Sequence, residues 1–148
     1  MKADNYMVAT FKSIPSNEAL SRVMVASFAS QADPSFEQIA DIKTAVSEAV
    51  TNSIVHGYEG REGEIKISCL MEGCLLTVII EDYGRGIEDV EQARQPLFTT
   101  NSDGERTGMG FTVMELFMDR VQVISKLGEG TRVIMTKELI PHTEDPVK

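Results

Sequence analysis

Three polar residues within positions 48–57 share a spacing that could serve metal chemistry. Glu48, Asn52 and His56 lie four residues apart, so on a helix they form one strip. This strip borders the apolar stripe of the same helix, at the edge of a core. A carboxylate and an amide oxygen together suit Mg²⁺, which prefers oxygen ligands and retains several waters. An ordinary solvated helix face has the same pattern and is the alternative interpretation.

A second pattern occupies residues 82–87, directly after an apolar run. Asp82 at a strand end could accept a hydrogen bond from an exocyclic amine. Gly84 and Gly86 would let the backbone approach a flat ligand closely. Because Asp and Gly also dominate ordinary turns, a simple turn is the alternative.

A third pattern, residues 104–111, leads into a short apolar helix. Successive N–H groups at a glycine-rich helix start can hold phosphates, although a loop with a helix cap has the same composition. The pattern is not a P-loop, because no Lys-Ser or Lys-Thr pair follows the glycines. Gly108 and Gly110 also lack the third glycine and the preceding strand of a dinucleotide-binding fingerprint.

The elements that must position these patterns alternate in a simple order. Apolar spacing and turn residues predict strands and helices in the order β-α-α-β-β-loop-α-β-β, hence one sheet with helices on one face, an α/β two-layer sandwich. Ser16 could cap the first helix, and Ser35 with Gln38 forms a capping box for the second. The expected strands are 6–12, 64–71, 74–81, 121–126 and 131–137; the expected helices are about 16–32, 35–57 and 111–117.

Composition narrows the classes of function. The chain has 148 residues, consistent with one domain, and 14 basic against 23 acidic residues give a net charge of −9. This balance disfavours direct binding to nucleic acid or to an anionic membrane surface. The start resembles no signal peptide and no run of about 18 apolar residues occurs, so we expect a cytoplasmic protein. Cys69 and Cys74 are too few for a disulfide framework.

The order and spacing of the three patterns resemble the GHKL ATPase and kinase superfamily, named after gyrase, Hsp90, histidine kinase and MutL. Residues 48–56, 82–86 and 104–110 resemble its N-box, G1 box and G2 box, and residues 130–131 resemble a later Gly-Thr element. Within the superfamily, three segments closely resemble the anti-sigma F factors of endospore-forming bacteria, and residues 17–18 and 22–23 fit as well. These segments are 47–52, 93–100 and 108–112.

The resemblance implies a Bergerat fold with a mixed, mostly antiparallel sheet. Residues 1–140 would form a single ATP-binding kinase domain with an ATP lid at about 95–110, and residues 141–148 a polar tail. The implied cofactors are ATP or ADP and Mg²⁺, with Asn52 as the metal ligand. The implied nucleotide-binding residues are Asn52, His56, Asp82, Gly84, Gly86, Ile87, Thr99, Thr100, Gly108, Met109, Gly110 and Thr131.

The resemblance also implies roles in catalysis. Glu48 would be the general base that takes a proton from a serine hydroxyl, and Arg106 the cation near the γ-phosphate. For His56, at the end of the helix, we favour a structural role over proton transfer. Two departures from the family pattern are Tyr83, where an acidic residue is more common, and Thr107, where Ser is common.

The implied function is a homodimeric anti-sigma factor. It would bind and inhibit a sporulation sigma factor of the sigma F type and would phosphorylate an anti-anti-sigma factor on serine. Glu18 and Arg22 would contact these partners. Between Glu18 and Asp33 the only charged residue is Arg22, and a helix that is apolar nearly all round is either a deeply buried core helix or an interface. We favour the interface, because a two-layer sandwich leaves one face of an outer helix uncovered.

Two other functions remain open after the sequence is read. A stress-type kinase acting on another sigma factor would share every motif. A non-catalytic, nucleotide-gated interaction module would keep the nucleotide residues without phosphoryl transfer. A histidine autokinase is disfavoured, because His56 lies within the nucleotide motif and His142 in the tail. A gyrase-like or chaperone-like ATPase would need a transducer domain, for which we expect no room.

Overall fold

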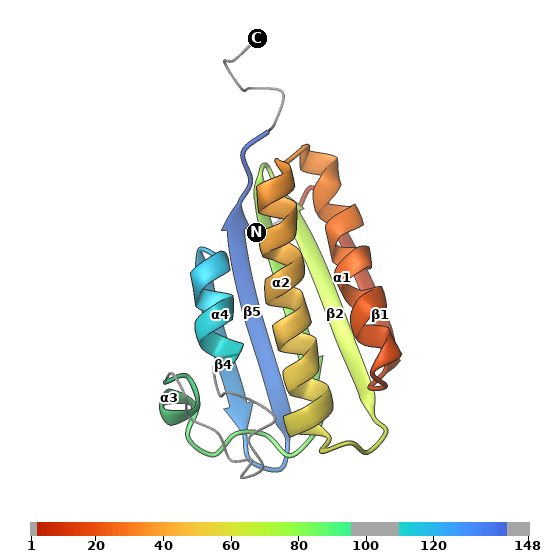
Figure 1. Cartoon of the computed structure of the whole chain (residues 1–148), viewed down its shortest axis with the longest axis vertical. Coiled ribbons are helices and arrows are strands. Elements are labelled where there is room, and N and C mark those ends of the chain that lie inside the picture. The colour runs from red at the N-terminus through yellow and green to blue at the C-terminus, as the bar shows by residue number, and fades with distance from the viewer. Residues whose placement is uncertain (1–2, 96–109, 142–148) are drawn as a thin grey trace.

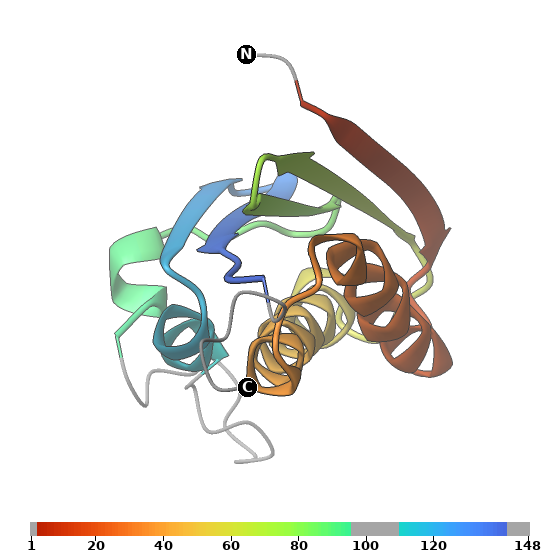
Figure 2. The ribbon, with the colours of Figure 1, turned by 90° about the horizontal axis from the view of Figure 1, so that it is seen from above.

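The computed structural model describes residues 3–95 and 110–141, which form a two-layer α/β sandwich (Figure 1). The sheet has the strand order β1-β2-β3-β5-β4, and the helices lie on one of its faces, as Figure 2 shows from above. The strands are β1 Asn5–Lys12, β2 Glu64–Glu72, β3 Leu75–Asp82, β4 Arg120–Lys126 and β5 Gly130–Glu138. The helices are α1 Ser16–Ala29, α2 Phe36–Asn52, α3 Val90–Ala93 and α4 Gly110–Phe117, with a 3₁₀ turn η1 Ser30–Ala32 and a π-helical turn η2 Ser53–Gly57.

The predicted fold class is confirmed, with one correction to the sheet. All four strand pairings in the described residues are antiparallel, so the sheet is not mixed. The connections explain this. The two opposed helices α1 and α2 return the chain to the end where β1 finished, so β2 runs back beside it (Figure 1). Hairpins then join β2 to β3 and β4 to β5.

The helix boundaries follow local hydrogen bonding. Ser35 caps α2 by accepting a bond from the Gln38 N–H at 3.2 Å, which confirms the Ser35 half of the predicted capping box. The reciprocal half is wrong, because the Gln38 side chain instead donates to the Glu138 carbonyl and accepts the Ile140 N–H. The predicted Ser16 cap is wrong. Pro15 holds the N-cap position of α1 without a side-chain cap bond, because the turn before the helix is closed by the Asn17 side chain donating to the Lys12 carbonyl at 2.9 Å.

The second predicted helix also ends differently from the expectation of one α-helix to residue 57. The α-helical hydrogen bonds stop at Asn52, and the chain continues as the π-turn η2. In that turn the Tyr58 N–H donates to the Ser53 carbonyl five residues earlier, at 2.9 Å. Such π-turns are rare and occur frequently at functional sites.

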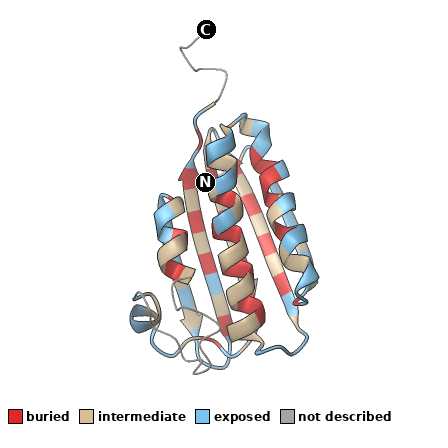
Figure 3. Cartoon of the chain, viewed as in Figure 1, coloured by how far each residue is buried: buried red, intermediate tan, exposed pale blue. Residues whose placement is uncertain are grey.

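One hydrophobic core lies between the helices and the sheet. Alternate strand residues face it, and this gives the banded burial of Figure 3. The fully buried large side chains are Val25, Ile42, Val46, Val50, Ile65, Ile67, Leu76, Val78, Ile80, Met114, Met135 and Leu139.

Helix α1 is not a deeply buried core helix. It buries Val25 and Phe28, whereas Leu20 and Val23 on its outer side are 47% and 54% exposed. This agrees with the expectation that one face of the helix is left uncovered. None of the helices in the described ranges is long and apolar enough to cross a bilayer.

The core generates a stability prediction. Val46→Ala on α2 should lower the free energy of unfolding by about 2 kcal/mol, because Val46 is fully buried and its lost methyl groups leave a cavity. Urea unfolding followed by circular dichroism measures this difference. Val23→Ala, on exposed α1 surface, is the matched control and should change stability by less than about 0.5 kcal/mol. Equal losses in the two variants would contradict the packing described.

Candidate functional site

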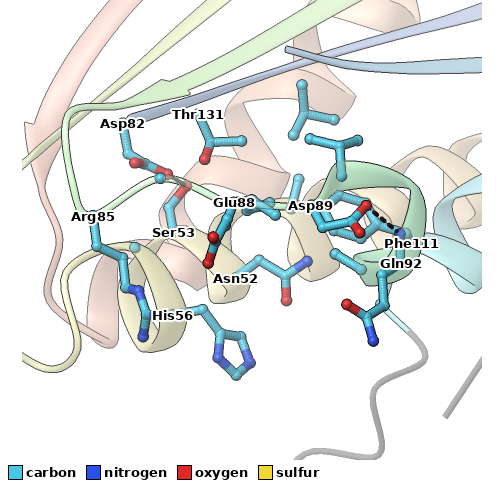
Figure 4. A pocket seen from close by; sticks show the side chains of 18 of the residues that line it. Asn52, Ser53, His56, Asp82, Arg85, Glu88, Asp89, Gln92, Phe111 and Thr131 are labelled. Atoms are coloured by element: carbon cyan, nitrogen blue, oxygen red, sulfur yellow. Dashed lines mark hydrogen bonds between the residues drawn. The ribbon is translucent and has the colours of Figure 1, made fainter. Parts of the chain in front are cut away.

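A cavity of about 820 Å³ opens at the C-terminal end of α2, a size typical of sites for small organic ligands (Figure 4). Its walls come from α2 and η2, the end of β3, the segment from Arg85 through α3, the start of α4, and β5. The lining residues are Ala49, Asn52, Ser53, His56, Gly57, Asp82, Arg85, Gly86, Ile87, Glu88, Asp89, Val90, Glu91, Gln92, Ala93, Gly110, Phe111, Thr131 and Val133.

Asp82, the last residue of β3, is the most buried acid of this wall. Its side chain is only 5% exposed, and both carboxylate oxygens accept hydrogen bonds. The Ser53 hydroxyl donates to Oδ2 at 2.7 Å, and the Gly84 N–H donates to Oδ1 at 3.0 Å. Burial raises the pKa of Asp82, and hydrogen bonds from Gly84, Ser53 and the Thr131 backbone partly offset that rise. The site therefore holds an oriented acceptor beside the cavity.

The turn after Asp82 packs main chain directly against main chain. A Cβ on Gly84 would lie 2.2 Å from the Gly57 carbonyl oxygen, the same oxygen that accepts the Arg85 N–H at 2.8 Å. Gly86 has a φ of +76°, and a Cβ there would lie 2.1 Å from the Lys126 carbonyl oxygen. These glycines therefore join the turn to η2 and to the β4–β5 hairpin, and Gly86 also lines the cavity.

One hydroxyl connects this turn to the opposite wall. Ser125 on β4 accepts the Ile87 N–H at 2.7 Å. Its Oγ also lies 2.9 Å from the Gly130 carbonyl oxygen and 2.8 Å from Oγ1 of Thr131. Ser125 thus holds Ile87 and Thr131, two lining residues, in fixed positions on both sides of Asp82.

The polar strip of the second helix reaches the cavity in part. Asn52 and His56 line it, whereas Glu48, one turn earlier and half-buried, is not among the described lining residues. The start of α4 lies against Asn52, since a Cβ on Gly110 would lie 3.0 Å from the amide nitrogen and 3.1 Å from the amide oxygen. The first and third sequence patterns therefore meet at this contact.

The donor set limits the kind of metal that could bind. Across residues 3–95 and 110–141, no group of three or more His, Cys, Asp and Glu side chains is arranged to hold a metal ion. Asn52 offers an amide oxygen at the cavity wall. This fits Mg²⁺ arriving with a phosphate ligand, because Mg²⁺ then takes most of its oxygens from phosphate and water.

Several predicted site residues lie elsewhere. Gly84 faces a smaller hollow beside Tyr58 and Tyr83 rather than the main cavity. Glu18 and Arg22 lie on α1, away from the cavity, and form an ion pair at 2.9 Å. The remaining expected residues fall outside the described part of the chain: Thr99, Thr100, Arg106, Gly108 and Met109.

Sequence reasoning missed three contributors to the site. Ser53 follows Asn52 and lies near the apolar stripe of the helix. Because a buried hydroxyl needs a hydrogen-bond partner, this position was the signal that could have identified it. Ser125 alternates in phase with Val121 and Val123, so it points inward as they do. Helix α3, capped by Asp89 accepting the Gln92 N–H at 3.1 Å, is too short for a periodic signal.

The chain matches a known family over most of its length. A family profile described as a histidine kinase-like ATPase domain matches residues 11–137. The anti-sigma F factor of Clostridium kluyveri is 54% identical over 134 residues, which cover 90% of this chain and 94% of that protein. The anti-sigma F factors of Clostridium novyi and Anoxybacillus flavithermus are 57% and 52% identical, each over 91% of this chain and over 95% and 93% of theirs.

Solved structures show the same fold at lower identity. The RsbU and RsbW domains of a Mycobacterium tuberculosis protein match with a TM-score of 0.67 at 20% identity, over 91% of this chain and 32% of that chain. The nucleotide-free catalytic domain of the histidine kinase ThkA matches with a TM-score of 0.57 at 17% identity, over 93% and 99%. Both likenesses establish the architecture alone.

The main-chain packing generates a second prediction. Gly86→Ala should lower the free energy of unfolding by about 3 kcal/mol, because the left-handed backbone is strained and the new methyl meets the Lys126 carbonyl. Gly73→Ala is the matched control. Gly73 has a φ of +60° with nothing within 4 Å, so only the backbone cost of about 1–2 kcal/mol applies. Urea unfolding of both variants checks this, and equal costs would rule out the close packing.

The buried carboxylate generates a third prediction. Because burial raises the pKa of Asp82 above its unfolded value, the native state binds this proton more tightly, and stability falls as pH rises between the two values. Wild type should therefore lose stability relative to Asp82→Asn as pH rises from about 4, the unfolded pKa of Asp, towards 7. The sign concerns this change with pH, because the Asn side chain of the variant has one acceptor oxygen and cannot keep both of the hydrogen bonds that Asp82 accepts.

Urea unfolding at several pH values measures the difference between Asp82→Asn and wild type. Asp33→Asn, at an exposed position, is the control and should show no such pH dependence. A wild type that gains stability relative to Asp82→Asn as pH rises from about 4 to 7 would contradict the expected sign.

Proposed function

Because the chain belongs to the anti-sigma F factor family of histidine kinase-like ATPase domains, we propose that it is a sigma-factor inhibitor and a serine kinase. It binds a sporulation sigma factor of the sigma F type and keeps it inactive. With ATP and Mg²⁺ it phosphorylates a serine of an anti-anti-sigma factor and so disables that antagonist. Membership in an ATPase-domain family supports nucleotide binding, and the cavity supplies a site for it.

The observation that carries the proposal is the meeting of three sequence patterns around one cavity. Asp82 and Thr131 line one part of it, while Asn52 and Gly110 line another. A buried carboxylate that accepts hydrogen bonds suits the amine of adenine. The N-terminus of α4 beside an amide oxygen suits phosphates and their cation, because a helix N-terminus attracts anions. ATP, or ADP after transfer, therefore binds with adenine at Asp82 and phosphates at Asn52.

Phosphoryl transfer then needs a base and charge compensation. The serine oxygen attacks the γ-phosphorus, the bond to the ADP oxygen breaks, and Glu48 takes the serine proton. Asn52 would hold Mg²⁺, which would neutralise charge at the phosphates when bound, and Arg106 would add a guanidinium there. The proposed lid segment 95–110 contributes four further nucleotide-binding residues, Thr99, Thr100, Gly108 and Met109. His56 orders the end of the polar strip.

The exposed side of α1 supports a partner surface. Leu20 and Val23 are exposed on the outer side of α1, and the Glu18–Arg22 ion pair lies on a different side of the same helix. Aromatic residues and Arg are typical of binding hot spots. We propose that Glu18 and Arg22 contact the sigma factor and the anti-anti-sigma factor, that the protein acts as a homodimer, and that it works in the cytoplasm, where RNA polymerase is.

One observation favours a second candidate function. Glu48 is not among the described residues that line the cavity, which is the geometry expected of a non-catalytic, nucleotide-gated interaction module. A kinase for a stress-type sigma factor would have the same site and differ only in its partner. Transfer of phosphate to a partner protein distinguishes the proposed kinase from the non-catalytic module. The identity of the sigma factor that is bound distinguishes it from a stress-type kinase.

Incubation with Mg·ATP and the candidate anti-anti-sigma protein should yield a phosphoserine, detected by mass spectrometry. Glu48→Gln should slow transfer by about 10²–10⁴-fold, because the serine proton loses its acceptor, while ATP binding persists. Binding of the sigma factor, measured by size-exclusion chromatography, should also persist.

Glu37→Gln, at an exposed position in the first turn of the same helix, is the matched control and should leave transfer unchanged. Unchanged transfer in Glu48→Gln would refute the base assignment. ATP binding by wild type without any transfer to the partner would favour the non-catalytic module.

A further inference from the structure

Ser53 occupies an unusual position in the site. It is the first residue of the π-turn η2, its side chain is 5% exposed, and its hydroxyl donates to Oδ2 of Asp82 at 2.7 Å. Figure 4 shows the two side chains facing each other, while Asn52 and His56 point to another part of the cavity. The residue therefore contacts the carboxylate proposed to recognise adenine, and not the phosphate end of the site.

The carboxylate of Asp82 is held by donors on both of its oxygens. The Gly84 N–H fixes Oδ1 and the Ser53 hydroxyl fixes Oδ2. The Thr131 backbone also donates to this carboxylate. The terminal torsion of an Asp side chain is otherwise broad, so each donor that is lost leaves the plane of the carboxylate less restrained. Gly57 leaves room on a third side, since a Cβ there would lie 3.0 Å from Oδ2.

We propose that Ser53 is a positioning residue that determines adenine specificity by fixing the plane of the Asp82 carboxylate. This inference rests on the proposed nucleotide site and deepens it. With Oδ1 and Oδ2 both engaged by donors, the remaining lone pairs point in set directions, and an exocyclic amine is accepted along one of them. Ser53 acts on the ligand only through Asp82.

The π-turn explains how one short segment serves both ends of the ligand. In η2 the Tyr58 N–H bonds to the Ser53 carbonyl, so the backbone is wider here than in α2. Asn52 ends the α-helix at the phosphate end, and Ser53 begins the π-turn at the base end. The proposed role of Ser53 in adenine specificity thus depends on the change from α-helix to π-turn between Asn52 and Ser53.

The test compares ATP with purine riboside triphosphate, which lacks the 6-amino group, by isothermal titration calorimetry. In wild type, ATP should bind more tightly than the analogue. Ser53→Ala should weaken ATP binding about tenfold, the scale of one hydrogen bond to a charged group, and leave the analogue within about twofold. In an Asp82→Asn background, Ser53→Ala should have no further effect on ATP affinity, because the two residues act as a unit.

Ser21→Ala is the matched control, because Ser21 is fully buried and its hydroxyl donates within α1, to the Glu18 carbonyl at 2.6 Å. It should leave both affinities unchanged. Ser53→Cys keeps the volume with a weaker donor, so it provides the same comparison if the alanine variant does not fold, and should weaken ATP binding selectively.

Two results would overturn the inference in distinguishable ways. Equal weakening of ATP and the analogue in Ser53→Ala, or no weakening of either, would leave the nucleotide site intact and make Ser53 a structural residue. A wild type that binds neither nucleotide would remove the proposed site itself, and the role of Ser53 with it.

Discussion

The site depends on one buried carboxylate at the end of the third strand. Asp82 is almost entirely shielded from water, yet it receives hydrogen bonds from η2 through Ser53 and from its own turn through Gly84. Strand pairing places Thr131 directly opposite it. A buried charge without partners would be costly, so the elements that supply those donors must keep their relative positions. The carboxylate therefore couples the end of the second helix, the glycine turn and the last hairpin.

Burial of the Asp82 carboxylate lowers the stability of the free protein, and we connect this cost with the proposed recognition of adenine. The raised pKa of Asp82 means that burial opposes its ionised form even after its hydrogen bonds are counted. In the proposed nucleotide site this cost has a benefit. An acceptor that is already desolvated and oriented would lose little further hydration when the amine of adenine binds. The hydrophobic core, in which Ile42 and Ile67 are fully buried, offsets the unfavourable free energy of burying this carboxylate.

Much of the architecture could be predicted from sequence because it follows from apolar spacing. The order of elements and the helix cap at Ser35 needed only local patterns and turn residues. The π-turn could not be predicted, because α- and π-helical turns of five residues present nearly the same apolar pattern. Ser125 was missed for a different reason. Its three neighbours, Ile87, Gly130 and Thr131, come from two separate segments, and only the folded sheet brings them to one hydroxyl.

The glycine turn has a consequence for how such a site can change over time. Its floor consists of main chain, with Gly84 against the Gly57 carbonyl and Gly86 against the Lys126 carbonyl. The exposed Tyr83 side chain does not line the main cavity, whereas Arg85 does. Sequence drift at position 83 can therefore accumulate while the main-chain packing of the turn stays constant. An uncommon Tyr at this position is thus compatible with an unaltered turn.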